Sequence, residues 1–189
     1  MRPYDLQQLL EEKPVIAAIK SDEGLEDCLQ VDCPVVFVLY GTVNTIPAIT
    51  EKLCAAGKTP LVHLDLLDGL SAAPAAVDYL ARHTSAAGVI STKNACIRYA
   101  KEQGLITVQR FFLLDSLALE NVKKADAQNH ADMIEILPGV MPKIVRTLTC
   151  TLRCPIIAGG LIRDKEDVVT ALSAGALAIS STNQSVWRL

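Results

Sequence analysis

Short apolar runs alternate with amphipathic stretches along the whole 189-residue chain. Most of the runs are dense in valine, isoleucine and leucine without strict alternation, which is typical of strands buried on both faces of a sheet. Several of them begin directly after a proline or a glycine, where a chain commonly turns. The predicted strands cover residues 15–19, 35–39, 61–64, 88–90, 105–108, 133–137, 156–158 and 177–179.

The stretches between these runs have the spacing of helices. Residues 164–175 begin with a capping aspartate and acids in the first turn, and then place apolar residues three and four positions apart. Further helices are predicted over residues 46–56 and 94–103, each followed by a glycine, and from residue 117 onward. Because parallel strands need a crossover connection, usually a helix, this alternation indicates a parallel sheet.

The regular spacing of the runs favours one architecture. From Val15 to Leu177 the numbering advances by 162 (177 − 15), and seven repeats cover this distance at about 23 residues each. We therefore predict an α/β fold, a compact TIM-type (β/α)₈ barrel that forms a single domain over residues 1–189, although ~200 residues is the usual lower bound. An open doubly wound sheet is the structural alternative.

Composition and charge limit the classes of function. The chain is 50% hydrophobic and 21% charged, and its net charge of −3 gives no electrostatic indication of a nucleic-acid partner. No apolar run approaches the ~18 residues of a membrane-spanning helix, and the first residues form no apolar signal segment. We expect a cytoplasmic protein without a membrane partner, with reduced cysteines. The histidines and cysteines lack metal-ligand spacing, so no metal and no cofactor is predicted.

The strongest chemical signal follows the last two predicted strands. Gly159-Gly160 stands after the seventh strand and Ser180-Ser181 after the eighth. Barrels often bind phosphate at these two loops, where glycines let the backbone approach the anion and hydroxyl groups add donors. We predict that Gly159, Gly160, Ser180 and Ser181 bind a phosphate group. The alternative is a tight turn at the glycines and a helix cap at the serines.

Charged residues at the other strand ends are predicted to line the mouth of the barrel. They are Lys20, Asp65, Lys93, Arg110 and Glu135. The two carboxylates are costly to bury unpaired, so we expect both to face the open mouth. Hydroxyl binding, or ion pairing with Lys20 and Arg110, is favoured over acid–base catalysis. A Schiff base at Lys20 or Lys93 is the less favoured enzymatic interpretation, against an ion pair or a phosphate contact.

Local evidence for a nucleic-acid surface is limited to a few basic residues. Lys143 and Arg146 share one face of the predicted sixth helix, because they are three residues apart. A solvated helix face is the simplest interpretation, and a contact with a phosphate backbone is the alternative. Aromatic residues for base stacking are scarce, at 4% of the chain.

Five sequence blocks, taken in order, are similar to a known family. They are 63–70 (HLDLLDGL), 88–93 (GVISTK), 109–116 (QRFFLLDS), 135–139 (EILPG) and 157–162 (IAGGLI). These blocks resemble the glycerol-3-phosphate-responsive antiterminators, the glycerol uptake operon antiterminator regulatory proteins. The likeness extends over residues 14–187, nearly the whole chain.

The resemblance implies a regulator and not an enzyme. Such a barrel binds glycerol 3-phosphate as an effector, acts on the leader mRNA of glycerol-metabolism genes and prevents transcription termination. The phosphate would lie at the glycine and serine pairs, charged residues of the mouth would bind the glycerol hydroxyls, and Lys143 and Arg146 are the candidate RNA contacts. The alternatives are a phosphate-binding barrel lyase, isomerase or synthase, and an interaction scaffold. A homo-oligomer contact at the barrel edge is left open.

Overall fold

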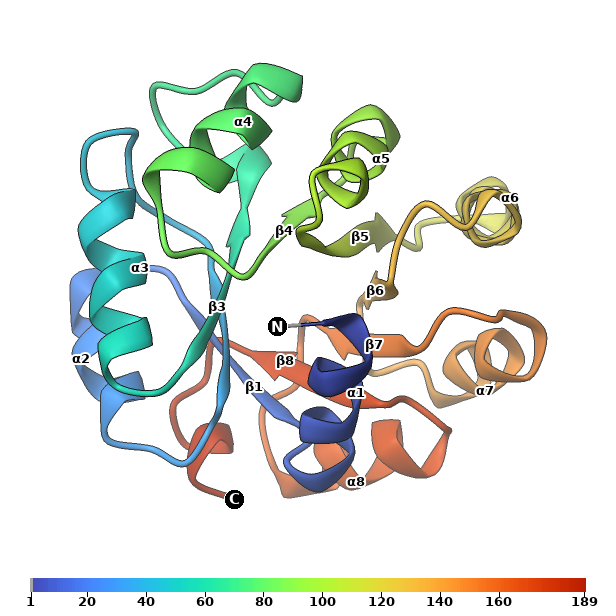
Figure 1. The fold of residues 1–189 in the computed structure, drawn as a ribbon. Coiled ribbons are helices and arrows are strands. Elements are labelled where there is room, and N and C mark those ends of the chain that lie inside the picture. Colours follow the sequence, from blue (N-terminus) through green and yellow to red (C-terminus); the bar gives the residue numbers. More distant parts are fainter. Residues whose placement is uncertain (1) are drawn as a thin grey trace.

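Eight parallel strands close into a barrel in the computed structural model, which describes residues 2–189 (Figure 1). Each strand pairs with its neighbours in the sequence, and β8 returns to pair with β1. This closure confirms the predicted TIM-type (β/α)₈ barrel and rules out the open sheet. The strands are β1 (Val15–Ile19), β2 (Val35–Val38), β3 (Thr59–His63), β4 (Gly88–Ser91), β5 (Ile106–Phe112), β6 (Met133–Leu137), β7 (Ile156–Gly159) and β8 (Ala178–Ser181).

Several strand boundaries differ from the prediction, and the pairing register explains the differences at β3 and β5. β3 begins at Thr59, because Thr59 and Pro60 pair with β2, and the chain leaves the sheet after His63. β5 continues four residues beyond the predicted end at residue 108, to Phe112, which pairs with Leu137. Arg110 therefore lies inside a strand and not in the loop that follows it.

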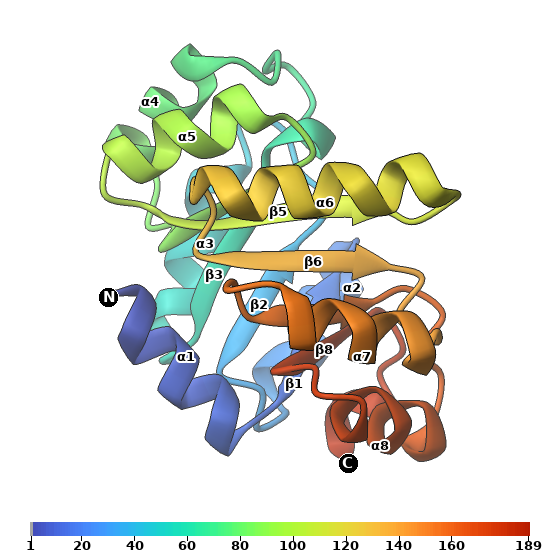
Figure 2. The same ribbon diagram turned by 90° about the vertical axis from the view of Figure 1, so that its right-hand side faces the viewer.

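Helices surround the ring of strands, and Figure 2 shows α6 and α7 lying along β5 and β6. Aspartate side chains cap α6 and α8, where Asp115 and Asp164 accept backbone N–H groups of the first turn. No helix in residues 2–189 is long and apolar enough to cross a membrane. The helices are α1 (Pro3–Glu12), α2 (Asp22–Leu29), α3 (Ile46–Ala55), α4 (Pro74–His83), α5 (Asn94–Glu102), α6 (Ser116–Gln128), α7 (Pro142–Thr151) and α8 (Lys165–Ser173), with the 3₁₀ turns η1 (Leu64–Leu66) and η2 (Val186–Arg188).

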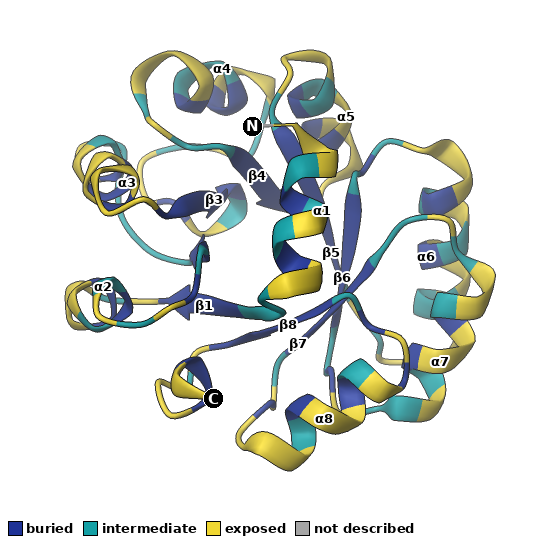
Figure 3. Cartoon of the chain, turned by 60° about the horizontal axis from the view of Figure 1, so that its bottom comes forward, coloured by how far each residue is buried: buried dark blue, intermediate teal, exposed yellow. Residues whose placement is uncertain are grey.

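The N-terminal helix α1 covers the end of the barrel at which the strands begin (Figure 3). Leu6 and Leu10 of α1 are fully buried in the same apolar cluster as Ile16, Phe37 and Leu61 from the strands. The barrel interior is therefore filled by side chains at this end, so a ligand site is expected at the opposite end, where the strands finish.

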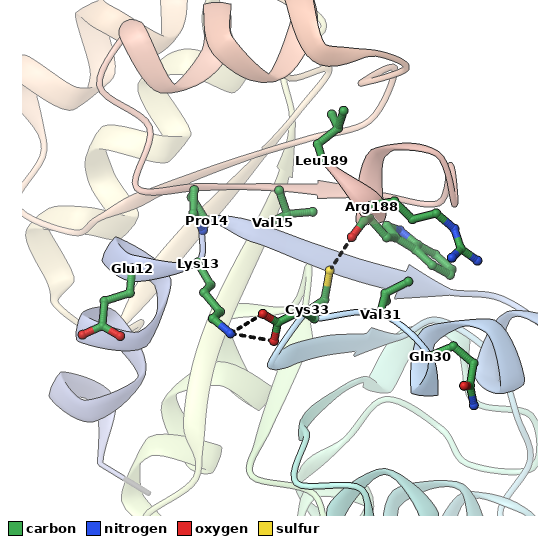
Figure 4. Close-up of a pocket in the computed structure, with 11 residues that line it drawn as sticks. Glu12, Lys13, Pro14, Val15, Gln30, Val31, Cys33, Arg188 and Leu189 are labelled. Atoms are coloured by element: carbon green, nitrogen blue, oxygen red, sulfur yellow. Dashed lines mark hydrogen bonds and ion pairs between the residues drawn. The ribbon is translucent and has the colours of Figure 1, made fainter.

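A pocket of about 400 Å³ lies in the outer wall, where η2 packs against β1 (Figure 4). Two contacts join residues of its lining. The Lys13 ammonium pairs with Asp32 at 2.5 Å, and the Cys33 thiol donates to the Trp187 carbonyl at 3.4 Å. All six cysteines are free thiols.

Candidate functional site

A second pocket, of about 430 Å³, opens at the end of the barrel where the strands finish. Its lining comes mainly from one side of the mouth. It includes Arg110 of β5, Glu135 of β6, the segment 160–163 after β7 and the segment 180–183 at the end of β8. These are the positions at which (β/α)₈ barrels commonly hold ligands.

Three buried side chains form the floor of this pocket. The Arg110 Nε donates to Glu135 Oε2 at 2.6 Å, and the Ser180 hydroxyl donates to Glu135 Oε1 at 2.6 Å. The alternation of each strand explains this arrangement, because Val108, Met133 and Ala178, two positions earlier, belong to the interior cluster. The Glu135 carboxylate is fully buried and paired, and not solvated at the open mouth as expected. Arg110 and Ser180 satisfy its two oxygens.

Gly159 leaves the space that the Glu135 carboxylate occupies. A Cβ atom at position 159 would lie 2.5 Å from Glu135 Oε1 and 2.6 Å from the Ser180 hydroxyl oxygen. Both distances are far below van der Waals contact, so the floor can form only where residue 159 is a glycine.

The segment after β7 is shaped by two consecutive residues with positive φ. Gly160 has φ +74° and Leu161 has φ +62°, a conformation that is uncommon for leucine. The Gly160 carbonyl accepts the Gly139 N–H at 3.1 Å, and the Ser181 hydroxyl donates to the Ile162 carbonyl at 2.8 Å. A hydroxyl carries one hydrogen, and both serine hydroxyls already donate theirs within the protein. Backbone N–H groups and arginines are therefore the donors that remain for an anion.

The charged residues in the pocket lining favour an anionic ligand. Arg110 and Arg163 are cationic and Glu135 is anionic, so the lining carries a net charge of +1 (2 − 1). The negative charge is already paired with Arg110. The pocket therefore has the electrostatic character that a phosphate ester requires.

The other side of the mouth is occupied by a closed network around Asp65, which follows β3. Its carboxylate accepts from the Ser91 hydroxyl at 2.6 Å and from the Thr92 N–H and hydroxyl at 2.7 Å each. Burial alone would raise the pKa of Asp65, but these hydrogen bonds hold it below its usual value. Lys93 is exposed and donates to the Ala72 carbonyl at 3.2 Å.

The nine residues predicted to bind the phosphate or to line the mouth thus fall into two groups. Arg110, Glu135, Gly160, Ser180 and Ser181 line the pocket, and Gly159 contributes to its floor. The remaining three, Lys20, Asp65 and Lys93, lie outside the lining.

Two residues of this region were not among the predicted site residues. Arg163 lines the pocket, and its place three residues after Gly160 was the signal for it. His63 is buried, and within residues 2–189 its Nδ1 has no hydrogen-bond partner. Burial, followed by the nearby Arg110 charge, lowers the pKa of His63 to about 4, against an opposing effect of Asp65. Its position two residues after the interior Leu61 was the signal that sequence reasoning missed.

The candidate RNA contacts lie on α7 and do not line this pocket. Lys143 and Arg146 are both exposed, while Val145 and Leu148 on the other face of the helix are buried. No group of three or more histidine, cysteine, aspartate or glutamate side chains in the described part of the chain has a geometry that could hold a metal ion.

The fold is that of a (β/α)₈-barrel protein, with a pocket over its last strands. The chain belongs to the glycerol-3-phosphate responsive antiterminator family, whose model matches residues 15–187. This match confirms the resemblance seen in the five sequence blocks.

The chain is similar to one curated protein and to two solved structures with antiterminator titles. The chain is 42% identical over 184 residues to the uncharacterized protein YgcP of Escherichia coli (strain K12), covering 97% of this chain and 96% of that protein. The crystal structure of a glycerol uptake operon antiterminator regulatory protein from Listeria monocytogenes is 33% identical, with a TM-score of 0.88 over 92% of this chain and 94% of that one. A glycerol uptake operon antiterminator-related protein from Thermotoga maritima is 28% identical, with a TM-score of 0.80 over 93% and 98%.

Proposed function

We propose that this protein is a cytoplasmic sensor of glycerol 3-phosphate that binds the leader mRNA of glycerol-metabolism genes and prevents transcription termination. Membership of a glycerol-3-phosphate responsive family supports the effector. The observation that carries the proposal is the pocket between the segments after β7 and β8, with two arginines against one carboxylate in its lining.

The phosphate group would lie at the rim of this pocket. Leu161, Ile162 and Thr182 of two neighbouring segments would supply backbone N–H groups, because those of Arg163 and Asn183 already donate to Asp167 and Ser181. The Arg163 side chain would supply a cation. The glycerol part would then extend toward the floor formed by Arg110, Glu135 and Ser180. A pocket of about 430 Å³ is large enough for such a small ester.

The arrangement supports ligand binding more than catalysis. A Schiff base requires a desolvated lysine, whereas Lys20 and Lys93 are exposed and neither lines the pocket. Glu135 is fully buried and accepts hydrogen bonds on both oxygens, so it is poorly placed to exchange protons with a substrate. Borohydride treatment in the presence of phosphorylated sugars tests this directly, and a covalent adduct at either lysine would favour the enzyme alternative.

Calorimetric titration with glycerol 3-phosphate tests the sensor proposal. We expect saturable heat with the ester, and weaker or no binding of glycerol and of inorganic phosphate, because each control lacks one half of the ligand. Absence of saturable heat with glycerol 3-phosphate would contradict the proposal.

The RNA part of the proposal has a separate test on α7. Substituting glutamine for the exposed pair Lys143 and Arg146 should weaken leader-mRNA binding, because contacts with RNA phosphates are lost. For each lost contact, the slope of log affinity against log salt concentration should also fall by about 1. Affinity for glycerol 3-phosphate should not change. Neutralising Arg82 and Arg98, which are exposed on α4 and α5, removes the same charge elsewhere and is the matched control. Equal effects of the two double variants would remove α7 from the RNA surface.

A further inference from the structure

The two charged side chains in the pocket floor differ in what they can offer a ligand. Glu135 has 0% of its surface exposed, and its two oxygens accept from Arg110 Nε and from the Ser180 hydroxyl, each at 2.6 Å. Arg110 keeps 7% of its surface exposed and lines the pocket. A ligand can therefore reach Arg110 without displacing an existing hydrogen bond. Glu135 has no exposed surface, and both of its oxygens already accept hydrogen bonds from the protein.

Arg110 also retains most of its donors. A guanidinium has five N–H groups, and the bond to Glu135 uses the one on Nε. The four N–H groups of the two Nη nitrogens remain for the pocket. Because a guanidinium only donates, it recognises groups that accept hydrogen bonds, such as hydroxyl oxygens.

The register of the sheet places Arg110 deeper than the phosphate loops. Arg110 pairs with Glu135, and Glu135 pairs with Ile157, which precedes Gly160 by three residues. A phosphate group held at segment 160–163 would therefore lie at the rim, and the carbon chain of the ester would extend toward Arg110.

Building on the proposed function, we propose that Arg110 binds the hydroxyl groups of the ligand and that Glu135 is a positioning residue which holds Arg110 by its Nε. Ser180 fixes the other Glu135 oxygen, and Gly159 leaves the space that this carboxylate occupies. The site is thereby specific for a phosphate ester of a polyol over an ester without hydroxyl groups. The specificity is carried by a chain of contacts from Ser180 through Glu135 to Arg110.

The test compares two ligands within each variant, glycerol 3-phosphate and ethyl phosphate, which carries the phosphate ester without free hydroxyl groups. The wild type should bind glycerol 3-phosphate more tightly. Arg110→Gln should lower the affinity for glycerol 3-phosphate by about 10- to 100-fold, the range of a hydrogen bond to a charged group. The affinity for ethyl phosphate should stay nearly unchanged. Glu135→Gln should reduce the same ratio of affinities by a smaller factor, because Arg110 remains but is no longer held.

Two further variants keep the test independent of folding. The double variant R110Q/E135Q removes both buried charges together, so no unpaired charge is left, and it should lose the preference for glycerol 3-phosphate as the single variant does. Arg98 and Glu102 form an exposed pair at 3.9 Å on α5. The matched changes R98Q and E102Q should leave both affinities as they are.

The outcomes separate this inference from the proposed function. Equal losses for both esters in R110Q would place Arg110 at the phosphate or assign it a purely structural role, and would overturn the inference. Unchanged affinity for both esters would overturn it too. A wild type that binds the two esters equally would also overturn the inference, because it would have a phosphate site without hydroxyl recognition. A wild type that binds neither ester contradicts the proposed function itself.

Discussion

The two halves of the barrel mouth use similar polar residues for different purposes. Around β3 and β4, the Asp65 carboxylate accepts three hydrogen bonds from Ser91 and Thr92 and does not line the pocket of about 430 Å³. Around β5 to β8, the Arg110–Glu135 pair forms the floor of this pocket, and Arg110 keeps donors that the protein does not use. The Asp65 carboxylate is satisfied by its own neighbours, whereas Arg110 has hydrogen-bonding capacity left for a ligand.

This difference shows why a charged residue at a strand end does not by itself identify a ligand site. A carboxylate or a cation there must be solvated, paired or bound to a ligand, and only the surrounding contacts decide which. The predictions below test whether the contacts of each half have the consequences that this comparison implies.

The largest expected effect is on stability, from breaking the buried pair on the ligand side. Glu135→Ala leaves the Arg110 charge buried without its partner, which costs about 3–5 kcal/mol in the free energy of unfolding. Urea denaturation followed by circular dichroism measures this loss. Glu102→Ala breaks the exposed Arg98–Glu102 pair and should cost at most about 1 kcal/mol. Similar losses in the two variants would mean that burial of the first pair has no energetic importance.

A second prediction concerns His63, which lies on β3 and whose pKa is lowered by burial and, in part, by the charge of Arg110 on β5. Burial and Arg110 lower the pKa of folded His63 to about 4, from an ordinary value of 6.5. Above pH 6.5 both the folded and the unfolded states are neutral at this residue. As pH falls from 6.5 toward 4, the unfolded state takes up a proton that the folded state does not, so stability decreases. Below the folded pKa this loss levels off.

The expected loss between about pH 7.5 and about pH 4.5 is about 2–3 kcal/mol, from 1.36 kcal/mol per pKa unit. His63→Gln should remove this part of the pH dependence, whereas His83→Gln, at an exposed position of α4, should retain it. The Asp65 contribution is lost at lower pH, because its pKa lies below 3.8. If H63Q and the wild type lose stability in parallel over this range, His63 is not the group that titrates.

The sequence was sufficient to predict the barrel, because eight buried runs at a regular spacing leave little choice of parallel topology. It also predicted polar residues near the strand ends, and of these Arg110, Glu135, Ser180 and Ser181 line the pocket. It was not sufficient to predict which half binds a ligand. The partners of Asp65 lie 26 and 27 residues away in the chain, and Ser180 lies 45 residues from Glu135. Such pairings depend on strand register and side-chain direction, which a hydrophobic pattern does not specify.

In the half of the mouth around β3 and β4, Asp65→Ala should reduce stability without changing the affinity for the ligand. Losing hydrogen bonds to a charged group should cost about 1.5–3 kcal/mol. Affinity for glycerol 3-phosphate should remain within error of the wild type, because Asp65 does not line the pocket. Urea denaturation and calorimetry measure the two quantities. Asp68→Ala, at an exposed neighbour, is the control for both. A marked loss of ligand affinity in D65A alone would join the two halves into one site.

The smallest expected effect on stability, at Gly160, separates backbone strain from ligand binding. Gly160 and Gly57 share a φ of +74°, so an alanine at either position is strained by about 1–2 kcal/mol. A Cβ atom at position 160 would lie 3.1 Å from Leu137 Cδ2 in the pocket wall, whereas one at position 57 meets nothing within 4 Å. Gly160→Ala should therefore displace the segment after β7 and weaken binding of glycerol 3-phosphate, while Gly57→Ala lowers stability alone. Thermal denaturation and calorimetry of the two variants measure this difference. Unchanged ligand affinity in G160A would mean that the conformation of this segment is not needed to bind the phosphate.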